Sequence, residues 1–279
     1  EFEAGVIHEL IYRYLFEINR YSTLAIIGFP MGIYVSGVAT LLPSLAVSSK
    51  GYRFAVVSAS NSKADMLKAL KHLAENYEQV ILIGHPFFIK DVIETARDIG
   101  LNLKKKRLRM MFCSEGFDEA WRKYVIDLTG KRLMPGDVIS TYGSSEMLLM
   151  AHETPLSVLT RISASKNHVL KKRIFGGITP NLFQYNPFLR YIESVGSELV
   201  FTAASGVPLI RFNLHDSGKV ISFQEMTSAL RRGKIKWSGA PKTVRKPLWR
   251  LPFVTLSGRS DYTMVFYAAN IYPEHIKMA

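Results

Sequence analysis

The stretch around which the chain is organised is Asp137-Val138-Ile139-Ser140-Thr141-Tyr142-Gly143-Ser144-Ser145-Glu146-Met147. It begins as an apolar strand and continues as a loop of small residues that presents hydroxyl groups and one carboxylate. An aromatic ring, a glycine, hydroxyls and an acid in consecutive positions suit a nucleotide, because they offer a ring face to a base, backbone room to a phosphate and oxygen to Mg²⁺. A tyrosine and a glycine after a strand also form ordinary turns, so the pattern needs support from the rest of the chain.

Upstream of this stretch, strand and helix patterns alternate. Apolar runs predict strands at residues 54–58, 79–84 and 108–113, and amphipathic runs predict helices at residues 62–77, 86–99 and 118–128. The run Val80-Ile81-Leu82-Ile83 is apolar on both faces, which is typical of a strand covered by helices on both sides. We therefore expect an α/β fold with a mostly parallel sheet flanked by helices.

Two loops follow strands of this expected sheet. Ser114 and Glu115 come after the strand at residues 108–113, and residues 142–146 come after the strand at residues 138–141. Because ligands of such sheets bind at the carboxyl ends of the strands, we expect both loops at one ligand-binding edge.

The N-terminal region contains a helix pattern and a long uncharged run. Residues 4–19 carry apolar side chains at three- and four-residue spacing, which predicts an amphipathic helix. Residues 21–49 contain no charged residue and are long enough to cross a bilayer as one helix. Glycines and the prolines Pro30 and Pro43 interrupt this run, so we expect a short strand at residues 24–27, a glycine-rich loop and a short buried helix instead of a membrane span.

The last third has a different character. From Tyr191 onward, strand signals with turns dominate, at residues 198–202, 209–212, 219–222, 251–256 and 263–267, with one short helix at residues 224–232. This pattern predicts a smaller antiparallel, barrel-like β subdomain. Residues 153–190 give no clear pattern.

Composition limits the function further. The chain has 279 residues, 48% of them hydrophobic, and a formal net charge of +13, which favours anionic ligands. The basic cluster Lys104-Lys105-Lys106-Arg107, with Arg109, lacks interleaved aromatics for base stacking, so we interpret it as a solvated face and do not expect nucleic-acid binding. A single cysteine, Cys113, excludes an intrachain disulfide and fits the cytoplasm. The histidines show no metal-ligand spacing.

Four segments in order resemble motifs of the adenylate-forming (acyl-CoA synthetase and ligase) superfamily, in particular its phenylacetate-CoA ligase type. They are Tyr142-Gly143-Ser144-Ser145-Glu146; Glu198-Leu199-Val200-Phe201-Thr202 with residues 208–216; Gly258-Arg259-Ser260-Asp261 at the family's hinge; and residues 270–276 after it. The resemblance covers most of the chain, from about Gly28 to the end. It implies the fold of the family's large N-terminal domain.

The resemblance also implies a Mg-ATP site. Tyr142 would stack on adenine within the loop that includes Gly143 and Ser144, and Ser114 and Glu115 would line the base. Ser145 would donate to the α-phosphate, Glu146 would hold Mg²⁺, Asp216 would accept the ribose hydroxyls, and Arg259 would reach ribose or phosphate. The reaction implied is activation of a small carboxylic acid as an acyl-adenylate, followed by transfer to CoA or another thiol. On its own, Asp216 before Ser217 and Gly218 also reads as a turn residue.

Departures from the family lead to a further expectation. The phosphate-binding loop with its trailing lysine is not found, the chain ends shortly past the hinge, and Tyr267 and Ala268 stand where a basic residue and a glycine line the thiol tunnel. We expect a partial catalytic domain, inactive in isolation. Its α/β subdomain would span residues 1–188, its antiparallel subdomain residues 189–260, and the hinge with the start of a further domain residues 261–279. The alternative is a non-catalytic fragment or degenerate relative that binds a nucleotide or a partner; the oligomeric state stays open.

Overall fold

The computed structural model describes residues 2–132, 134–204, 207–235, 249–260, 264–266 and 269–271. The chain separates into two compact units, Glu1–Leu149 and Met150–Ala279. The subdomain boundaries that we predict at residues 188 and 260 follow the sequence segments to which we assign functions, and they stay predictions. Asp261, Tyr267, Ala268 and residues 272–276, all named in the sequence analysis, lie outside the described residues.

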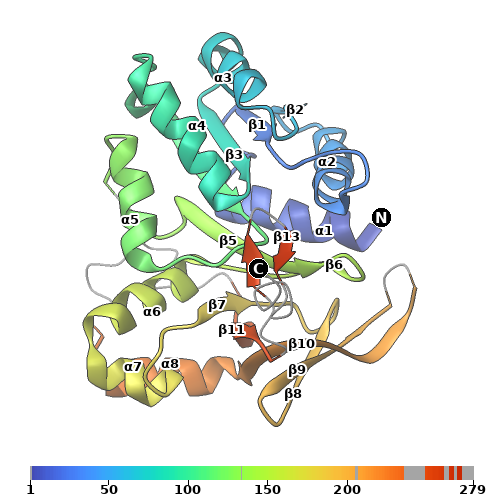
Figure 1. The fold of residues 1–279 in the computed structure, drawn as a ribbon, viewed down its shortest axis with the longest axis vertical. Helices are drawn as coiled ribbons and strands as arrows, with labels where there is room; N and C mark the ends of the chain where they lie inside the picture. Colours follow the sequence, from blue (N-terminus) through green and yellow to red (C-terminus); the bar gives the residue numbers. More distant parts are fainter. Residues whose placement is uncertain are drawn as a thin grey trace. The chain divides into compact units, whose positions relative to one another are not determined.

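Unit 1 is built on parallel strands (Figure 1). The described strands are ordered β2 (Phe54–Ser58), β1 (Thr23–Ile27), β3 (Gln79–Gly84), β4 (Arg107–Phe112) and β5 (Val138–Ser144). The pairings of β1 with β2 and β3, of β3 with β4 and of β4 with β5 are parallel, and all six residues of β3 are buried. The predicted parallel sheet is confirmed. After β5, β6 (Leu148–His152) crosses the border between the two units.

Helices lie on both faces of this sheet. On one face α3 (Lys63–His72), α4 (Pro86–Asp98) and α5 (Glu119–Leu128) share a core with alternate strand residues such as Leu82 and Met110. Short 3₁₀ turns follow α3 and precede β4, at Ala74–Asn76 and Leu103–Lys105. Ser62 caps α3, since its side chain accepts the Asp65 N–H.

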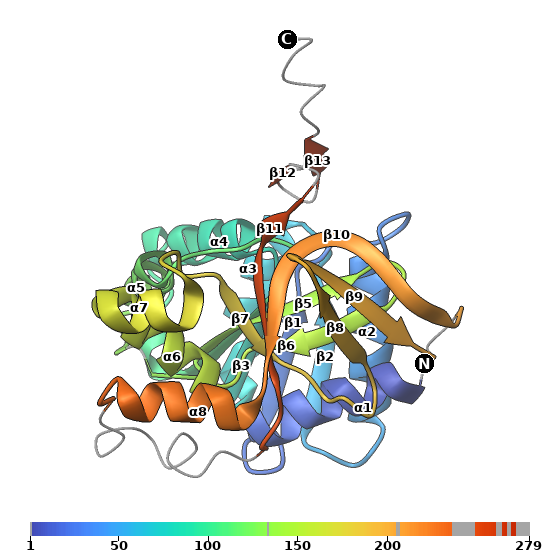
Figure 2. The ribbon, with the colours of Figure 1, turned by 90° about the horizontal axis from the view of Figure 1, so that it is seen from below.

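On the other side lie α1 (Phe2–Leu10), a π-helical turn at Ile11–Leu15, and α2 (Val35–Ser48) (Figure 2). The helix expected over residues 4–19 is present as α1 and this turn. Tyr12 of the π-helical turn contacts both α2 and the sheet. Its hydroxyl is 2.7 Å from Ser44 Oγ of α2, and its ring centroid is 5.0 Å from that of Phe54 in β2.

The prediction for α2 was partly wrong. The strand and loop before it are as expected, but the helix runs for 14 residues through Gly37 and Pro43 and is not fully buried. It buries small residues such as Thr40 and Ser44, and its apolar residues Val35, Val38, Leu42 and Leu45 are exposed. Within the part of the chain that the structure describes, no helix combines the length and the hydropathy that crossing a bilayer requires.

Unit 2 begins with two helices that the sequence pattern did not reveal. These are α6 (Pro155–Lys166) and α7 (His168–Phe175), and together with α8 (Phe223–Arg232) they bury Leu156, Leu170 and Leu230 in one core. Thr154 caps the start of α6 with a capping box. The Thr154 hydroxyl oxygen accepts the Ser157 N–H, and the Ser157 hydroxyl oxygen accepts the Thr154 N–H.

The strands of unit 2 are antiparallel, as predicted. Their order is β7 (Asn181–Gln184), β11 (Phe253–Arg259), β10 (Leu209–Ile221), β9 (Glu198–Ala203) and β8 (Tyr191–Val195). Figure 2 shows β10 as a long curved strand beside β9. The two strands expected at residues 209–212 and 219–222 are thus parts of one strand. A short hairpin pairs β12 (Met264–Phe266) with β13 (Ala269–Ile271).

Candidate functional site

The loops after β4 and β5 lie at one edge of the unit 1 sheet. The two strands are parallel neighbours, with Phe112 opposite Ser140. Thr141, just beyond, donates its hydroxyl to the Phe112 carbonyl at 2.9 Å, which ties the two strand ends together. The expectation that both loops share the carboxyl edge of the sheet is confirmed.

The turn after β5 is tight and presents two polar side chains. Ser144 Oγ accepts the Met147 N–H at 3.2 Å, and a Cβ on Gly143 would lie 2.4 Å from the Leu148 carbonyl oxygen, so only glycine fits there. Ser145 and Glu146 are exposed at the tip of the turn. Neither side chain makes a hydrogen bond or an ion pair with a described residue, so the turn leaves a hydroxyl and a carboxylate available to a ligand.

The other predicted base-binding residues of unit 1 are placed differently from one another. Ser114 is exposed and adopts a positive φ of 77°, which turns the chain sharply after β4. Glu115 and Tyr142 are buried, with 8% and 6% of their surface exposed. Stacking of Tyr142 on adenine therefore stays a prediction that requires its ring to be uncovered.

Asp216 and Arg259 come together in unit 2. They are paired across the antiparallel strands β10 and β11, although 43 positions of sequence separate them. Asp216 is buried and lies inside β10, so the interpretation as a turn residue is wrong. Beyond Asp216 the pairing shifts between Ser217 and Gly218, where a Cβ on Gly218 would lie 2.0 Å from the Thr255 carbonyl oxygen.

A polar cluster beside this pair was missed by the sequence analysis. Glu198 accepts hydrogen bonds from Asn213 Nδ2 at 2.7 Å and from the Ser260 hydroxyl, and the Ser260 N–H donates to the His215 carbonyl at 2.7 Å. The hydrogen bond from Ser260, followed by that from Asn213, holds the pKa of Glu198 below its usual value. These contacts fix the chain on either side of Asp216 and directly after Arg259.

The structure thus assembles the predicted residues in two groups. Unit 1 brings together the group of Ser114, Glu115 and residues 142–146, and unit 2 brings together Asp216 and Arg259. No sequence signal marked Asn213 or Ser260 as their supports, because their contacts depend on strand pairing between distant segments.

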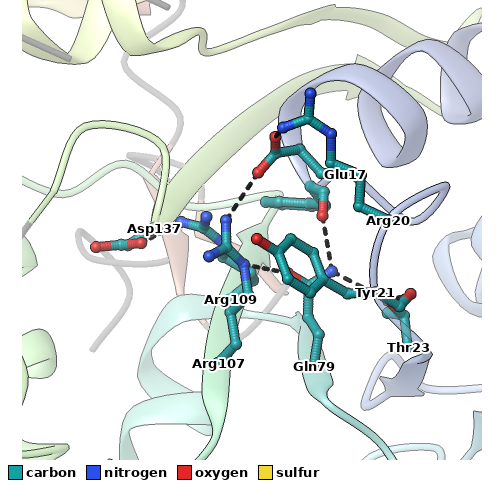
Figure 3. A network of polar contacts seen from close by, with 9 residues as sticks. Glu17, Arg20, Tyr21, Thr23, Gln79, Arg107, Arg109 and Asp137 are labelled. Atoms are coloured by element: carbon teal, nitrogen blue, oxygen red, sulfur yellow. Dashed lines mark hydrogen bonds and ion pairs between the residues drawn. The ribbon is translucent and has the colours of Figure 1, made fainter. Parts of the chain in front are cut away.

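The opposite, amino-terminal edge of the unit 1 sheet carries a network of paired charges (Figure 3). Arg107 donates to Gln79 Oε1 at 3.1 Å and to Glu17 Oε2 at 2.8 Å, and its guanidinium lies 4.3 Å from the Tyr21 ring centroid. Arg109 forms an ion pair with Asp137, and only 11% of the Arg109 side chain is exposed. The prediction of a solvated basic face is therefore wrong for these two arginines, which are partners in a structural network.

Among the described residues no group of three or more histidine, cysteine or acidic side chains could hold an ion by itself. Mg²⁺ commonly takes one or two protein carboxylates and completes its shell with water and substrate phosphates. A single exposed carboxylate such as that of Glu146 fits this type of site.

Solved structures with similar folds were found. Over 99% of this chain, structures of 2-hydroxyisobutyryl-CoA ligase superpose with TM-scores of 0.59 (an open conformation with 2-HIB-AMP and CoA) and 0.58 (the postadenylation state with R3-HIB-AMP), at 12% and 13% identity. The McyG A-PCP structure with phenylalanyl-adenylate superposes with a TM-score of 0.56 over 99% of this chain, at 11% identity.

The chain has the fold of the adenylate-forming ligases. The fold implied by the sequence resemblance is confirmed. This chain spans 53%, 52% and 40% of the lengths of the three solved chains, respectively. Models of known protein families gave no match to the sequence, and neither did a search of curated proteins.

Proposed function

We propose that the chain carries the nucleotide-binding part of an ATP-dependent ligase that activates a small carboxylic acid as an acyl-adenylate. The observation that carries this proposal is the carboxyl edge of the unit 1 sheet, where Ser145 and Glu146 stand exposed without partners among the described residues. Exposed, unengaged polar groups at this edge of a parallel sheet are typical of a ligand site.

Each residue has a chemical role in this proposal. The Ser145 hydroxyl donates to the α-phosphate, and Ser114, Glu115, Tyr142, Gly143 and Ser144 form the base-binding loops. Asp216 accepts the two ribose hydroxyls, because a carboxylate is a bidentate acceptor, and Arg259 stabilises negative charge on ribose or phosphate oxygens. The pairing of Asp216 with Arg259 supports the assignment of both to one nucleotide.

Glu146 would hold Mg²⁺, which supplies charge neutralisation for the phosphates when it is bound. Ser145 and Arg259 act on the same charge, which grows as the substrate carboxylate attacks the α-phosphorus and pyrophosphate leaves. Positioning and charge stabilisation of this kind require no covalent step on the protein.

The finer assignments rest on the resemblance of the sequence. We propose an acid–thiol ligase of the phenylacetate-CoA ligase type, with CoA or another thiol as acceptor and the cytoplasm as location. The fold similarity to structures that contain adenylates and CoA supports the reaction class. Tyr267 and Ala268, which would line the thiol tunnel, lie outside the described residues.

Pyrophosphate exchange tests the proposal. The intact protein is expected to exchange labelled pyrophosphate into ATP in the presence of aryl or aliphatic acids. Glu146→Ala should lower the rate by about 100-fold or more, because the Mg²⁺ that neutralises transition-state charge loses its ligand. Asp216→Asn should also lower the rate, because it removes one of the two carboxylate acceptors of the ribose hydroxyls. Glu75→Ala, which removes an exposed acid elsewhere in unit 1, is the matched control and should keep the full rate. Exchange that survives both site substitutions would refute the site assignment.

A further inference from the structure

One buried histidine at the carboxyl edge of the unit 1 sheet has no role in the proposed nucleotide site. His85 follows the last residue of β3 and directly precedes α4, and only 5% of its surface is exposed. Neither of its ring nitrogens has a hydrogen-bond partner among the described residues. A buried polar group left unsatisfied costs about 1–3 kcal/mol, so native proteins rarely leave one without a reason.

Strand register places His85 among the site residues of unit 1. Gly84 is opposite Phe112 of β4, and Phe112 is opposite Ser140 of β5. His85 therefore stands one residue beyond this row, as Cys113 and Thr141 do on the next two strands. Ser114 and Tyr142 each follow one residue later in the chain, after Cys113 and Thr141. His85 therefore lies at the same edge of the sheet as the proposed nucleotide loops.

The surroundings of His85 hold its ring in place. The ring of Phe29, which follows β1 and is 2% exposed, meets the imidazole edge to face, with centroids 5.1 Å apart and planes at 88°. A Cβ on Gly84 would lie 3.0 Å from Ile89, and a Cβ on Gly28 would lie 2.9 Å from Phe88. The two glycines let Ile89 and Phe88 approach the backbone beside both rings, so the imidazole lies in an apolar frame.

The chemistry of the ring selects the kind of group that it can bind. Burial lowers the pKa of His85, which keeps the imidazole neutral near pH 7, with one nitrogen donating and the other accepting. A carboxylate would favour the charged ring, which burial opposes. A hydroxyl group matches a neutral imidazole, because it accepts from the N–H or donates to the bare nitrogen.

We propose that His85 hydrogen-bonds a hydroxyl substituent of the carboxylic acid substrate and so selects hydroxylated acids over their hydrocarbon parents. This inference rests on the proposed function, since it names a substrate class for the same edge of the sheet. A site built to hydrogen-bond a hydroxyl discriminates strongly against the analogue that lacks it, because the buried partner is then left unsatisfied. Phe29 would contact the apolar part of the same molecule.

The direct test observes the ring itself. We would record ¹⁵N spectra of the intact protein labelled in its histidines, with AMP present, and identify His85 through its contact with the Phe29 ring. The probes are two matched pairs, 4-hydroxyphenylacetate with phenylacetate and 6-hydroxyhexanoate with hexanoate. At least one hydroxylated acid is expected to shift a His85 ring nitrogen, whereas its parent acid leaves that nitrogen unchanged.

Substitutions provide the second measurement. His85→Phe should abolish the preference for the hydroxylated acid, which we expect to be about 100-fold in wild type, as the cost of one unsatisfied buried polar group implies. His85→Gln, which keeps a donor and an acceptor, should restore part of it. Circular dichroism on both variants separates loss of selectivity from loss of folding. The ¹⁵N spectra of the wild-type protein test the inference without any substitution.

Two results would overturn the inference. Ring nitrogens of His85 that respond to no probe acid while AMP binds would show that the ring bonds only an ordered water, and a hydroxyl preference that persists in His85→Phe would place selectivity elsewhere. In both cases the proposed function stands. Failure of wild type to bind AMP in the same samples would instead overturn the proposed function, and this inference with it.

Discussion

The two edges of the parallel sheet in unit 1 carry polar residues of opposite kinds. At the amino edge, the charges of Glu17, Arg107, Arg109 and Asp137 are paired with one another (Figure 3). At the carboxyl edge, Ser145, Glu146 and the ring nitrogens of His85 have no partners among the described residues. The same sheet thus pairs its charged groups at one edge and, among the described residues, leaves polar groups without partners at the other.

The difference follows from what each arrangement does to free energy. A buried charge stabilises a fold only when its partner is in place, and removal of one partner leaves the other uncompensated. An exposed group without a protein partner contributes little to stability and is available for binding. Substitutions at the amino edge should therefore lower stability, and substitutions at the carboxyl edge should lower ligand binding.

The largest effect is expected from Asp137→Ala at the amino edge. This change leaves the largely buried guanidinium of Arg109 without its ion-pair partner, which should lower the free energy of unfolding by about 3 kcal/mol. Urea denaturation measures this value. Asp127→Ala, which removes the acid of an exposed i,i+4 pair with Lys123, is the matched control and should change stability by less than about 0.5 kcal/mol.

A second, smaller effect is expected where the carboxyl edge itself is structural. Gly143→Ala places a Cβ against the Leu148 carbonyl oxygen, so the turn must open, at a cost of about 2 kcal/mol. Gly5→Ala in α1 meets no atom within 4 Å and should be neutral or stabilising. Equal thermal stability of these two variants would show that the turn is not held by this contact.

The smallest effects are changes in folding stability with pH, which occur in different pH ranges for the two edges. Burial lowers the pKa of His85, so the unfolded chain binds a proton that the folded chain does not, and stability should fall as pH drops below about 6.5. At the amino edge, the N–H and the hydroxyl of Ser22 lower the pKa of Glu78, so the stability from its carboxylate is present above about pH 4.3 and is lost at lower pH.

Two variants measure these contributions by denaturation across pH. His85→Phe should flatten the dependence of stability on pH below about 6.5, and Glu78→Gln should flatten it only below about 4.3. His152 is also buried and has a lowered pKa, so it keeps its own pH dependence in both variants. A His85→Phe curve parallel to that of wild type would contradict the neutral, buried imidazole.

Most of the parallel sheet could be predicted because its strands are marked locally. β3 is a continuous apolar run between a cap-containing helix and a proline-initiated one, and Pro86 marks the start of α4. The pairing of the loops after β4 and β5 followed from one rule of parallel sheets. Local patterns were sufficient where each element buries a regular apolar face.

Other features depend on contacts that no local pattern reveals. Gly37 lies inside α2 because Pro30 approaches the helix backbone closely there, and a Cβ would lie 2.3 Å from the Pro30 carbonyl oxygen. Arg107 and Arg109 looked like part of a solvated run, yet their partners Glu17 and Asp137 come from distant segments. α6 could have been found, since Thr154, Pro155 and Ser157 form a helix-start signal that we overlooked.

Calorimetric titration of the intact protein with MgATP tests the central claim most directly, because it requires no knowledge of the acid. We expect wild type to bind MgATP with measurable heat, Glu146→Ala to bind it at least about tenfold more weakly, as loss of a metal-coordinating carboxylate predicts, and its thermal stability to remain that of wild type. Folded wild-type protein that gives no heat with MgATP or with AMP would contradict the assignment of the carboxyl edge as a nucleotide site.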